Sequence, residues 1–415
     1  MIIKSNSSVI RAEFILWALF AFLMPIWQNI LPLILGCILI LRVIFKSEKV
    51  NTSTRTDRVY LVMFILLYAA HALGMMWTEN VAHGLFDLQV KLALVLIPIL
   101  LFTTPLDKED LINAGLGGLV AGSVTAALVS FLYVAWNYLN GGDLVLFAGT
   151  GFSFYMHQGY YASFFCISLI VLTELLIRRN KLFTGIALKL AWVCVLLLSA
   201  AIIFTLSRTG SIVFILIVLA LALKAIFKWR SKKILGILLV GLAANIVLIT
   251  TTADRLMGRF DGLIKTLSVP EQLDIIAKDA NTVRILLWDI STDIISNNAL
   301  IGVGTGDIKD EIRSNAVKKG YTGVASMDLN VHNQFTQVFM TLGILAFLIF
   351  AMLFVVPLIE AFRRRSLLIF LIVAALGLFS LTESFIERQA GVMLFSFIFP
   401  LLVFHFRKFR IDTTK

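Results

Sequence analysis

The sequence predicts an all-α polytopic membrane protein with about twelve transmembrane helices and one large extracytoplasmic loop. Hydrophobic residues make up 59% of the 415 residues and charged residues only 15%, whereas soluble domains average about 45–50% and about 25%. The mean hydropathy is +0.93. The apolar residues fall in stretches close to the ~20 residues that a membrane-spanning helix needs, and basic residues gather beside these stretches. Together these observations exclude a soluble globular protein.

Twelve stretches are apolar enough to be spans. We place them at residues 11–26, 29–45, 58–77, 85–103, 112–136, 156–177, 186–206, 210–227, 234–252, 334–358, 367–384 and 390–406. Spans seven and eight are so close in sequence that they must form a tight hairpin. The predicted organisation is therefore spans one to nine in residues 1–252, a polar loop with short helices in 253–331, and spans ten to twelve with a tail in 332–415.

Basic residues predict the orientation of these spans. Nearly all connections on one side are basic, with runs at 42–58, 178–181, 228–233, 363–365 and 407–410. The positive-inside rule makes that side cytoplasmic, so both termini are cytoplasmic and the polar loop is outside. The net charge of +11 does not indicate nucleic acid, because the basic residues lie next to apolar spans. The expected surroundings are membrane lipids.

The polar loop contains two recognisable local patterns. Residues 280–298 look like an amphipathic helix, with Asn281 as a plausible N-cap and with Arg284 and Trp288 four residues apart on one face. The segment Gly302–Asp307, the glycine-rich turn, is not followed by Lys-Ser/Thr and no strand precedes it. It fails the context test for a nucleotide-binding loop, so a structural turn is the favoured interpretation.

Two arginines could bind an anion on the outer side. Arg208 lies at the outer end of a span, where Ser207 and its neighbours leave backbone and hydroxyl groups available; the alternative is an arginine whose stem extends to lipid headgroups. Arg284 lies in the loop, and its alternative is a solvated helix face or an ion pair with Asp289 or Asp293. Arginine binds phosphate oxygens through a bidentate fork.

One histidine stands out as a candidate base. His332 opens the tenth span, where the positive end of the helix dipole favours the neutral ring. A neutral imidazole can take a proton from a hydroxyl group, although a histidine at a helix start can also be a cap without chemistry. His157, at the outer start of the sixth span, is its only rival.

Neither a metal nor another cofactor is predicted. The outer loops contain no Asp-x-Asp pair and no two histidines at helical spacing, which are the ligand patterns that metal sites use. Asp87 and Lys91, near the fourth span, are the main charged residues that a transport pathway could use; they could equally be an interfacial pair.

At this point the chain resembles the bacterial O-antigen ligases and the related O-antigen polymerases and O-linked oligosaccharyltransferases. The resemblance rests on SRTG at 207–210, TVRILLW at 282–288, GVGTGD at 302–307 and HNQF at 332–335, within residues 205–345. It implies a metal-independent enzyme of the type C glycosyltransferase kind in the bacterial inner membrane. Such an enzyme transfers a polysaccharide from undecaprenyl diphosphate to lipid A-core at the periplasmic face.

The resemblance also implies residue roles. Arg208 and Arg284 match the family arginines, and Arg284 would contact the diphosphate. His332 matches the histidine required for transfer, and displacement with one base predicts inversion at the anomeric carbon. His157 and Ser207 are further candidates for substrate binding. The segments Thr382–Ser384, which includes Glu383, and Glu387–Arg388 are also similar to the family, but they receive no role from the sequence.

Alternative functions remain at this stage. A polymerase of the same superfamily often has two outer loops of comparable size, so one dominant loop favours a ligase. A protein-glycosylating transferase would be expected to have an added C-terminal domain. A membrane transporter is the alternative from another class, although no paired half-repeats with broken helices are visible. The sequence assigns no glycan, acceptor sugar or oligomeric state.

Overall fold

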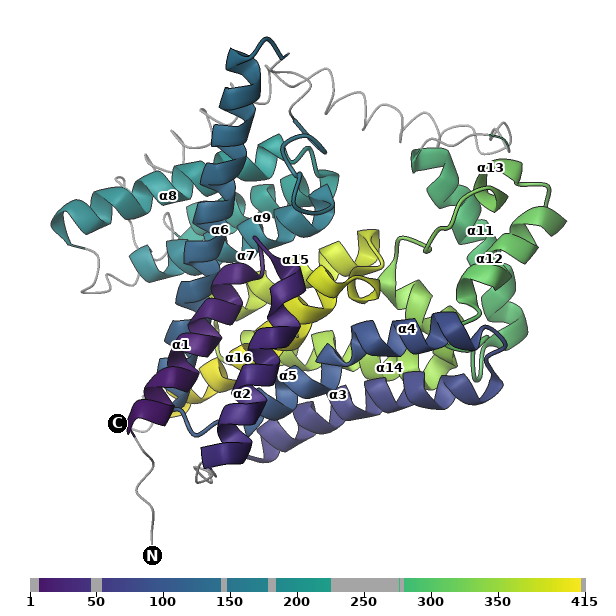
Figure 1. The fold of residues 1–415 in the computed structure, drawn as a ribbon, viewed down its shortest axis with the longest axis horizontal. Helices are drawn as coiled ribbons and strands as arrows, with labels where there is room; N and C mark the ends of the chain where they lie inside the picture. Colours follow the sequence, from purple (N-terminus) through teal and green to yellow (C-terminus); the bar gives the residue numbers. More distant parts are fainter. Residues whose placement is uncertain are drawn as a thin grey trace, which may run out of the picture. The chain divides into compact units, whose positions relative to one another are not determined.

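The computed structural model describes residues 7–45, 54–142, 148–177, 184–224, 276 and 280–411. Within these ranges every regular element is a helix (Figure 1), so the all-α prediction is confirmed there. The ninth predicted span, 234–252, and most of the predicted loop before residue 280 lie outside the described residues. The chain divides into two compact units, and each is described by itself.

Seven described helical stretches are long and apolar enough to cross a membrane: Gln28–Phe45, Arg55–Trp77, Val81–Phe102, Lys108–Leu139, Gln158–Ile177, Gly185–Phe204 and Gln334–Arg363. Two shorter apolar helices cover Leu367–Thr382 and Gln389–His405. Helices α1 (Ser7–Leu23) and α9 (Arg208–Lys224) overlap the first and eighth predicted spans. Helices thus lie at each of the eleven predicted spans that fall within the described residues, while the total of twelve stays a prediction.

The first unit consists of residues 1–50, 105–258 and 361–379. Its described helices are α1, η1 (Gln28–Ile30), α2 (Leu31–Phe45), α6 (Lys108–Leu139), α7 (Gln158–Ile177), α8 (Gly185–Phe204), α9 and most of α15 (Leu367–Thr382). Almost every residue of α7 is buried. Helices α8 and α9 are joined by only three residues, which confirms the predicted tight hairpin.

Two glycines allow α6 to pack closely on α1. A Cβ atom on Gly118 would lie 2.4 Å from the carbonyl oxygen of Ala18, and one on Gly122 would lie 2.0 Å from that of Phe22. Small residues four apart on one face let two membrane helices approach to backbone contact. The two glycines therefore fix the position of α1 on α6.

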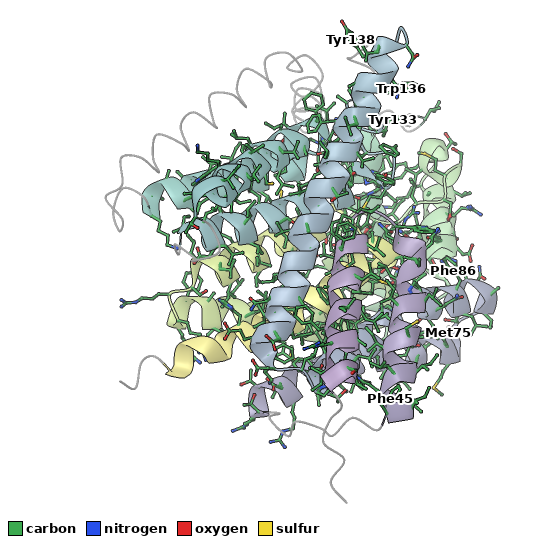
Figure 2. The ribbon with its side chains drawn as sticks, turned by 60° about the vertical axis from the view of Figure 1, so that its left-hand side comes forward. Phe45, Met75, Phe86, Tyr133, Trp136 and Tyr138 are labelled. Atoms are coloured by element: carbon green, nitrogen blue, oxygen red, sulfur yellow. The ribbon has the colours of Figure 1, made fainter. Side chains whose placement is uncertain are left out.

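The end of α6 is rich in exposed aromatic residues. Its 32 residues span about 48 Å at the usual helical rise, which exceeds the ~30 Å hydrocarbon core of a bilayer. Tyr133, Trp136 and Tyr138 lie near this end, and their side chains project away from the helix (Figure 2). Tyrosine and tryptophan are favoured at the boundary between membrane and water, so this end of α6 suits an interfacial position.

The second unit consists of residues 51–104, 259–360 and 380–415. Its described helices are α3 (Arg55–Gly74), η2 (Met75–Trp77), α4 (Val81–Lys91), α5 (Ala93–Phe102), α11 (Ala280–Asn298), α12 (Ile308–Lys318), α13 (Thr322–Ala325), most of α14 (Gln334–Arg363), η6 (Phe385–Glu387) and α16 (Gln389–Ile411). Helices α11, α12 and α13 gather at one end of α3 and α4 (Figure 1).

The loop helices α11–α13 have a hydrophobic core of their own. Its buried members are Val283, Leu286, Leu287, Ile290, Ile294, Ile308, Ile312, Ala316, Val324, Val331 and Met340. Apolar residues of α11 recur at the three- and four-residue spacing of one helix face, which explains why this face is buried. Because Met340 belongs to α14, the same core ties the loop helices to a predicted span.

Helix α14 is broken near its start. Gly343 adopts φ 75° and ψ −171°, a conformation that side chains rarely allow. The break releases backbone groups, and the glycine-rich turn satisfies them. Val303 N donates to Met340 O at 2.9 Å, and Gly304 N donates to Thr341 O at 3.0 Å. Buried backbone groups need such partners, so the turn fills the break.

The other side of the glycine-rich turn is held by the last turn of α3 and by the connection between α3 and α4. Thr305 Oγ1 donates to the carbonyl oxygen of His71 at 2.6 Å. The carboxylate of Asp307 accepts from the backbone N–H groups of Glu79, at 2.9 Å, and Asn80, at 2.7 Å. The structural interpretation of this turn is therefore confirmed: it joins α14 to the α3–α4 connection.

Candidate functional site

Glu383 brings together two of the predicted site residues in the second unit. Its Oε1 accepts from Nη2 of Arg284 at 2.9 Å, and its Oε2 lies 3.1 Å from Nδ1 of His332. The three side chains are 12%, 22% and 29% exposed respectively. They are thus half-buried, which shields their charges from full solvent screening yet leaves them within reach of a substrate. We call this group the Glu383 triad.

Arg284 enters the triad from the first turns of α11. The neighbouring Val283 and Leu287 are buried in the loop core, and Arg284 lies on the flank of this buried face, on the same side as the exposed Trp288. Helix α11 starts at Ala280, and the predicted N-cap at residue 281 is therefore wrong, because that residue is already inside the helix.

The predicted alternative partners of Arg284 are engaged elsewhere. Lys319 Nζ lies 2.6 Å from Asp289 Oδ2 and 2.7 Å from Asp293 Oδ2. The hydrogen bond from Lys319 lowers the pKa of Asp289, and a second bond from Tyr321 acts in the same direction. These pairs fasten α11 to the segment after α12. Arg284 pairs with Glu383 and not with either of these aspartates.

His332 lies just before α14 and is not its first residue. Asn333 is the cap, since its Oδ1 accepts from the N–H groups of Phe335 and Thr336 at 3.0 and 3.2 Å. The expectation that His332 opens the helix is corrected accordingly. His332 has φ 55°, an uncommon conformation for a residue with a side chain. The residue before His332, Val331, is buried in the loop core.

Glu383 defines which nitrogen of His332 carries a proton in the neutral ring. An ionised carboxylate only accepts hydrogen bonds, so the contact at Nδ1 requires a proton there. Nε2 is then the acceptor nitrogen. A carboxylate that orients a histidine in this way is a recurring arrangement in enzymes that use an imidazole base. Chemically, the triad can take up a proton at Nε2 beside a guanidinium.

The other predicted site residues belong to the first unit. Arg208 is the first residue of α9 and is partly buried. Ser207 caps this helix, because its Oγ accepts from the N–H of Gly210 at 3.1 Å. A Cβ atom on Gly210 would lie 2.8 Å from Cβ of Ala162 in α7. The small size of Gly210 thus lets the first turn of α9 rest on α7.

His157 acts as a cap in this structure. It precedes α7, and its Nδ1 accepts from the N–H of Gly159 at 3.3 Å. The ring is exposed and packs edge-on against Tyr160, with 6.2 Å between ring centroids. The cap role that the sequence offered as one alternative for His332 is therefore the role that the structure gives to His157.

The sequence missed Glu383 as the centre of the site. It lies between α15 and η6, far from Arg284 and His332 in the sequence. The available signal was the pair of acids Glu383 and Glu387 at the outer end of two predicted spans, where unpaired charge is costly. Glu387 also finds partners, in Lys91 and Gln334. Within the described ranges, no three His, Cys, Asp or Glu side chains gather as a metal site would require.

Comparison with known proteins gives one family. Residues 193–351 match the family model described as O-antigen ligase, and no curated protein matches the chain. The matched region covers less than half of the chain, and it includes Arg208, Arg284 and His332. This region of the chain is thus similar to the O-antigen ligase family, and the described part of the chain has helices long and apolar enough to cross a membrane.

Proposed function

We propose that the chain is an O-antigen ligase, a metal-independent inverting glycosyltransferase. It would transfer a polysaccharide from undecaprenyl diphosphate to lipid A-core at the periplasmic face of the bacterial inner membrane. The observation that carries the proposal is the Glu383 triad, which pairs a guanidinium with an oriented imidazole. Both the arginine and the histidine of the triad lie inside the matched family region.

The triad supplies the base. Nε2 of His332 takes the proton of the acceptor sugar hydroxyl as its oxygen attacks the anomeric carbon of the donor glycan. Glu383 keeps the Nδ1 proton in place and stabilises the imidazolium that forms. General base catalysis of this kind contributes typically ~10²–10⁴-fold. Because one direct attack replaces the leaving group, the configuration at the anomeric carbon inverts.

The arginines assist departure of the lipid diphosphate. The bond between the anomeric carbon and the bridging oxygen breaks, and the electron pair stays on the diphosphate. Arg284 and Arg208 each offer guanidinium donors, which bind phosphate oxygens bidentately. Arg208 is also the first residue of α9, where backbone N–H groups and the helix dipole favour an anion. Two guanidinium groups would thus neutralise the developing charge without a metal.

A reconstituted transfer reaction tests this proposal. The purified protein, in lipid nanodiscs, would receive a carrier-linked polysaccharide and lipid A-core. We expect polymer-bearing lipid A-core as product, and we expect Arg284→Ala to lower the rate by at least about 10²-fold. Arg313→Ala is the matched control, because Arg313 is an exposed arginine of α12. Absence of transfer by the wild-type protein, with intact substrates and folded protein, would refute the proposal.

A polymerase of the same superfamily would use the same chemistry on a different acceptor. Surface lipopolysaccharide from a deletion strain separates the two functions. We expect bare lipid A-core with accumulated carrier-linked polymer, as loss of a ligase predicts. Lipid A-core that bears a single repeat unit would instead identify a polymerase.

A further inference from the structure

A completely buried lysine contacts the turn that follows Glu383. Lys91 is the last residue of α4, and its side chain is 0% exposed. Its Nζ lies 2.5 Å from Oδ1 of Asp87 and 2.6 Å from Oε2 of Glu387. A buried charge persists only when it is paired and hydrogen-bonded. Both carboxylates meet this requirement, so the lysine is held as a cation between them.

The two carboxylates differ in what they connect. Asp87 is one turn away on the same helix, so its contact with Lys91 is local. Glu387 comes from η6, the turn between α15 and α16, so its contact with Lys91 joins α4 to a different part of the second unit. This second contact gives Lys91 a role in tertiary structure that a local pair would not have.

Glu387 and its turn are also bound to the start of α14. Gln334, the first residue of α14, is 0% exposed. Its Nε2 donates to Oε1 of Glu387 at 3.0 Å, and its Oε1 accepts from the N–H of Ile386 at 2.8 Å. Gln334 therefore holds the turn by two hydrogen bonds, one of which depends on the carboxylate that Lys91 also contacts.

These contacts join the same two segments that meet in the triad. Gln334 is two residues beyond His332, and Glu387 is four residues beyond Glu383. In the first contact the side chain of His332 is 29% exposed, whereas in the second contact Gln334 is 0% exposed and Glu387 is 10% exposed. Lys91 contacts Oε2 of Glu387 while Gln334 contacts Oε1, so Lys91 neutralises this carboxylate and fixes its direction.

We propose that Lys91 is a positioning residue for the transfer reaction: through Glu387 and Gln334 it holds the segment of His332 against the segment of Glu383. The inference rests on the proposed function for its catalytic readout. It also assigns the charged pair Asp87–Lys91, which a transport pathway could have used, to the support of an enzyme site. A displacement of only about 1 Å in a reacting group can cost 10²-fold in rate.

The test compares Lys91→Met with wild-type protein in the reconstituted transfer reaction. We expect kcat to fall about 10²-fold while the KM for the donor changes less than about twofold, because the arginines remain. Lys91→Arg, which keeps the cation, should recover much of the lost kcat. Lys224→Met is the matched control, because it removes a partly buried ion pair elsewhere in the chain, between Lys224 and Glu174 at 3.2 Å. This variant should retain wild-type kcat.

Hydrogen exchange provides a readout that does not depend on activity. The N–H of Ile386 should exchange at least about tenfold faster in Lys91→Met, because its acceptor Gln334 loses its fixed partner. Gln334→Met should show the same faster exchange and the same fall in kcat. It leaves the ion pairs of Lys91 intact, so it keeps the inference testable if Lys91→Met does not fold.

The outcomes separate the inference from the proposed function. A folded Lys91→Met protein with wild-type kcat and wild-type exchange would overturn the inference. A raised donor KM with unchanged kcat would also overturn it, because Lys91 would then act in donor binding. If wild-type protein transfers nothing while Lys91→Met still exchanges faster at Ile386, the proposed function fails and the positioning role stands.

Discussion

Replacement of Glu383 by glutamine tests the chemistry of the triad with the smallest change in shape. Glutamine has the size of glutamate, and its carbonyl oxygen can still accept from Nη2 of Arg284. Its amide nitrogen, however, would face Nδ1 of His332, which lies 3.1 Å from the carboxylate in the wild-type protein. An amide N–H donates, so the neutral ring must move its proton to Nε2. The nitrogen that should accept the hydroxyl proton is then occupied.

The magnitude follows from the contacts that are lost. A hydrogen bond to a charged group contributes about 1.5–3 kcal/mol, and about 1.4 kcal/mol corresponds to a factor of ten. Loss of the bond to His332 alone therefore predicts a fall in kcat of about 10- to 100-fold. Loss of the correct tautomer of His332 lowers kcat further. The total loss cannot exceed the ~10²–10⁴-fold that a general base contributes. We expect Glu383→Gln to lower kcat by about 10²–10³-fold.

The assay is the initial rate of transfer by purified protein at saturating donor, with folding checked by thermal unfolding. Asp328→Asn is the matched control, because Asp328 is a loop carboxylate paired with Lys309 at 2.6 Å but is 61% exposed. It should retain wild-type kcat. If Glu383→Gln retains wild-type kcat while His332→Ala is inactive, the carboxylate neither orients nor stabilises the imidazole, and our reasoning is wrong.

Four further predictions concern the predicted site and topology. His332→Ala should still bind carrier-linked donor but lose about 10²–10⁴-fold in kcat, whereas His157→Ala should stay active; the reverse result would move the base to the start of α7. Arg208→Ala or Arg284→Ala should nearly abolish transfer, and the lysine variants should recover little because they lack the planar fork; fully active lysine variants would reduce the role to simple charge attraction. Transfer should survive EDTA, and loss that Mg²⁺ reverses would contradict a metal-independent reaction. Cysteine at Ser314, an exposed position of α12, should react with an impermeant maleimide added from outside the inner membrane. If this cysteine reacts only after the membrane is permeabilised, the predicted topology is wrong.

Helices were the most predictable part of the fold. A membrane span needs about 20 apolar residues, and this requirement is visible in the sequence without any knowledge of packing. The break in α14 was not predictable, because Gly343 inside an apolar stretch also suits an unbroken helix. What fixes its conformation is the glycine-rich turn, about forty residues earlier, and hydrogen bonds between distant backbone groups leave no periodic signal in the sequence.

The candidate site was predicted in part for the same reason. Arg284 and His332 were identifiable one at a time, because a charged or titratable residue near a membrane surface is conspicuous. Glu383 and its neighbour Glu387 were noticed without a role, since their partners come from other segments of the second unit. Helical periodicity indicates which face of a helix is buried, but it does not indicate which loops meet at its end.

The anchoring of the glycine-rich turn has a consequence for engineering the polar segment that carries it. A Cβ atom on Gly302 would lie 2.3 Å from the backbone of Thr341, and one on Gly306 would lie 2.2 Å from the carbonyl oxygen of Asn80. Extra residues here have no space, and they would pull the segment away from α14. Gly320, by contrast, has open space around it. An epitope tag or fluorescent reporter should therefore not be inserted at Gly302 or Gly306, and an insertion at Gly320 would separate Lys319 from Tyr321, whose contacts with Asp289 fasten the segment to α11.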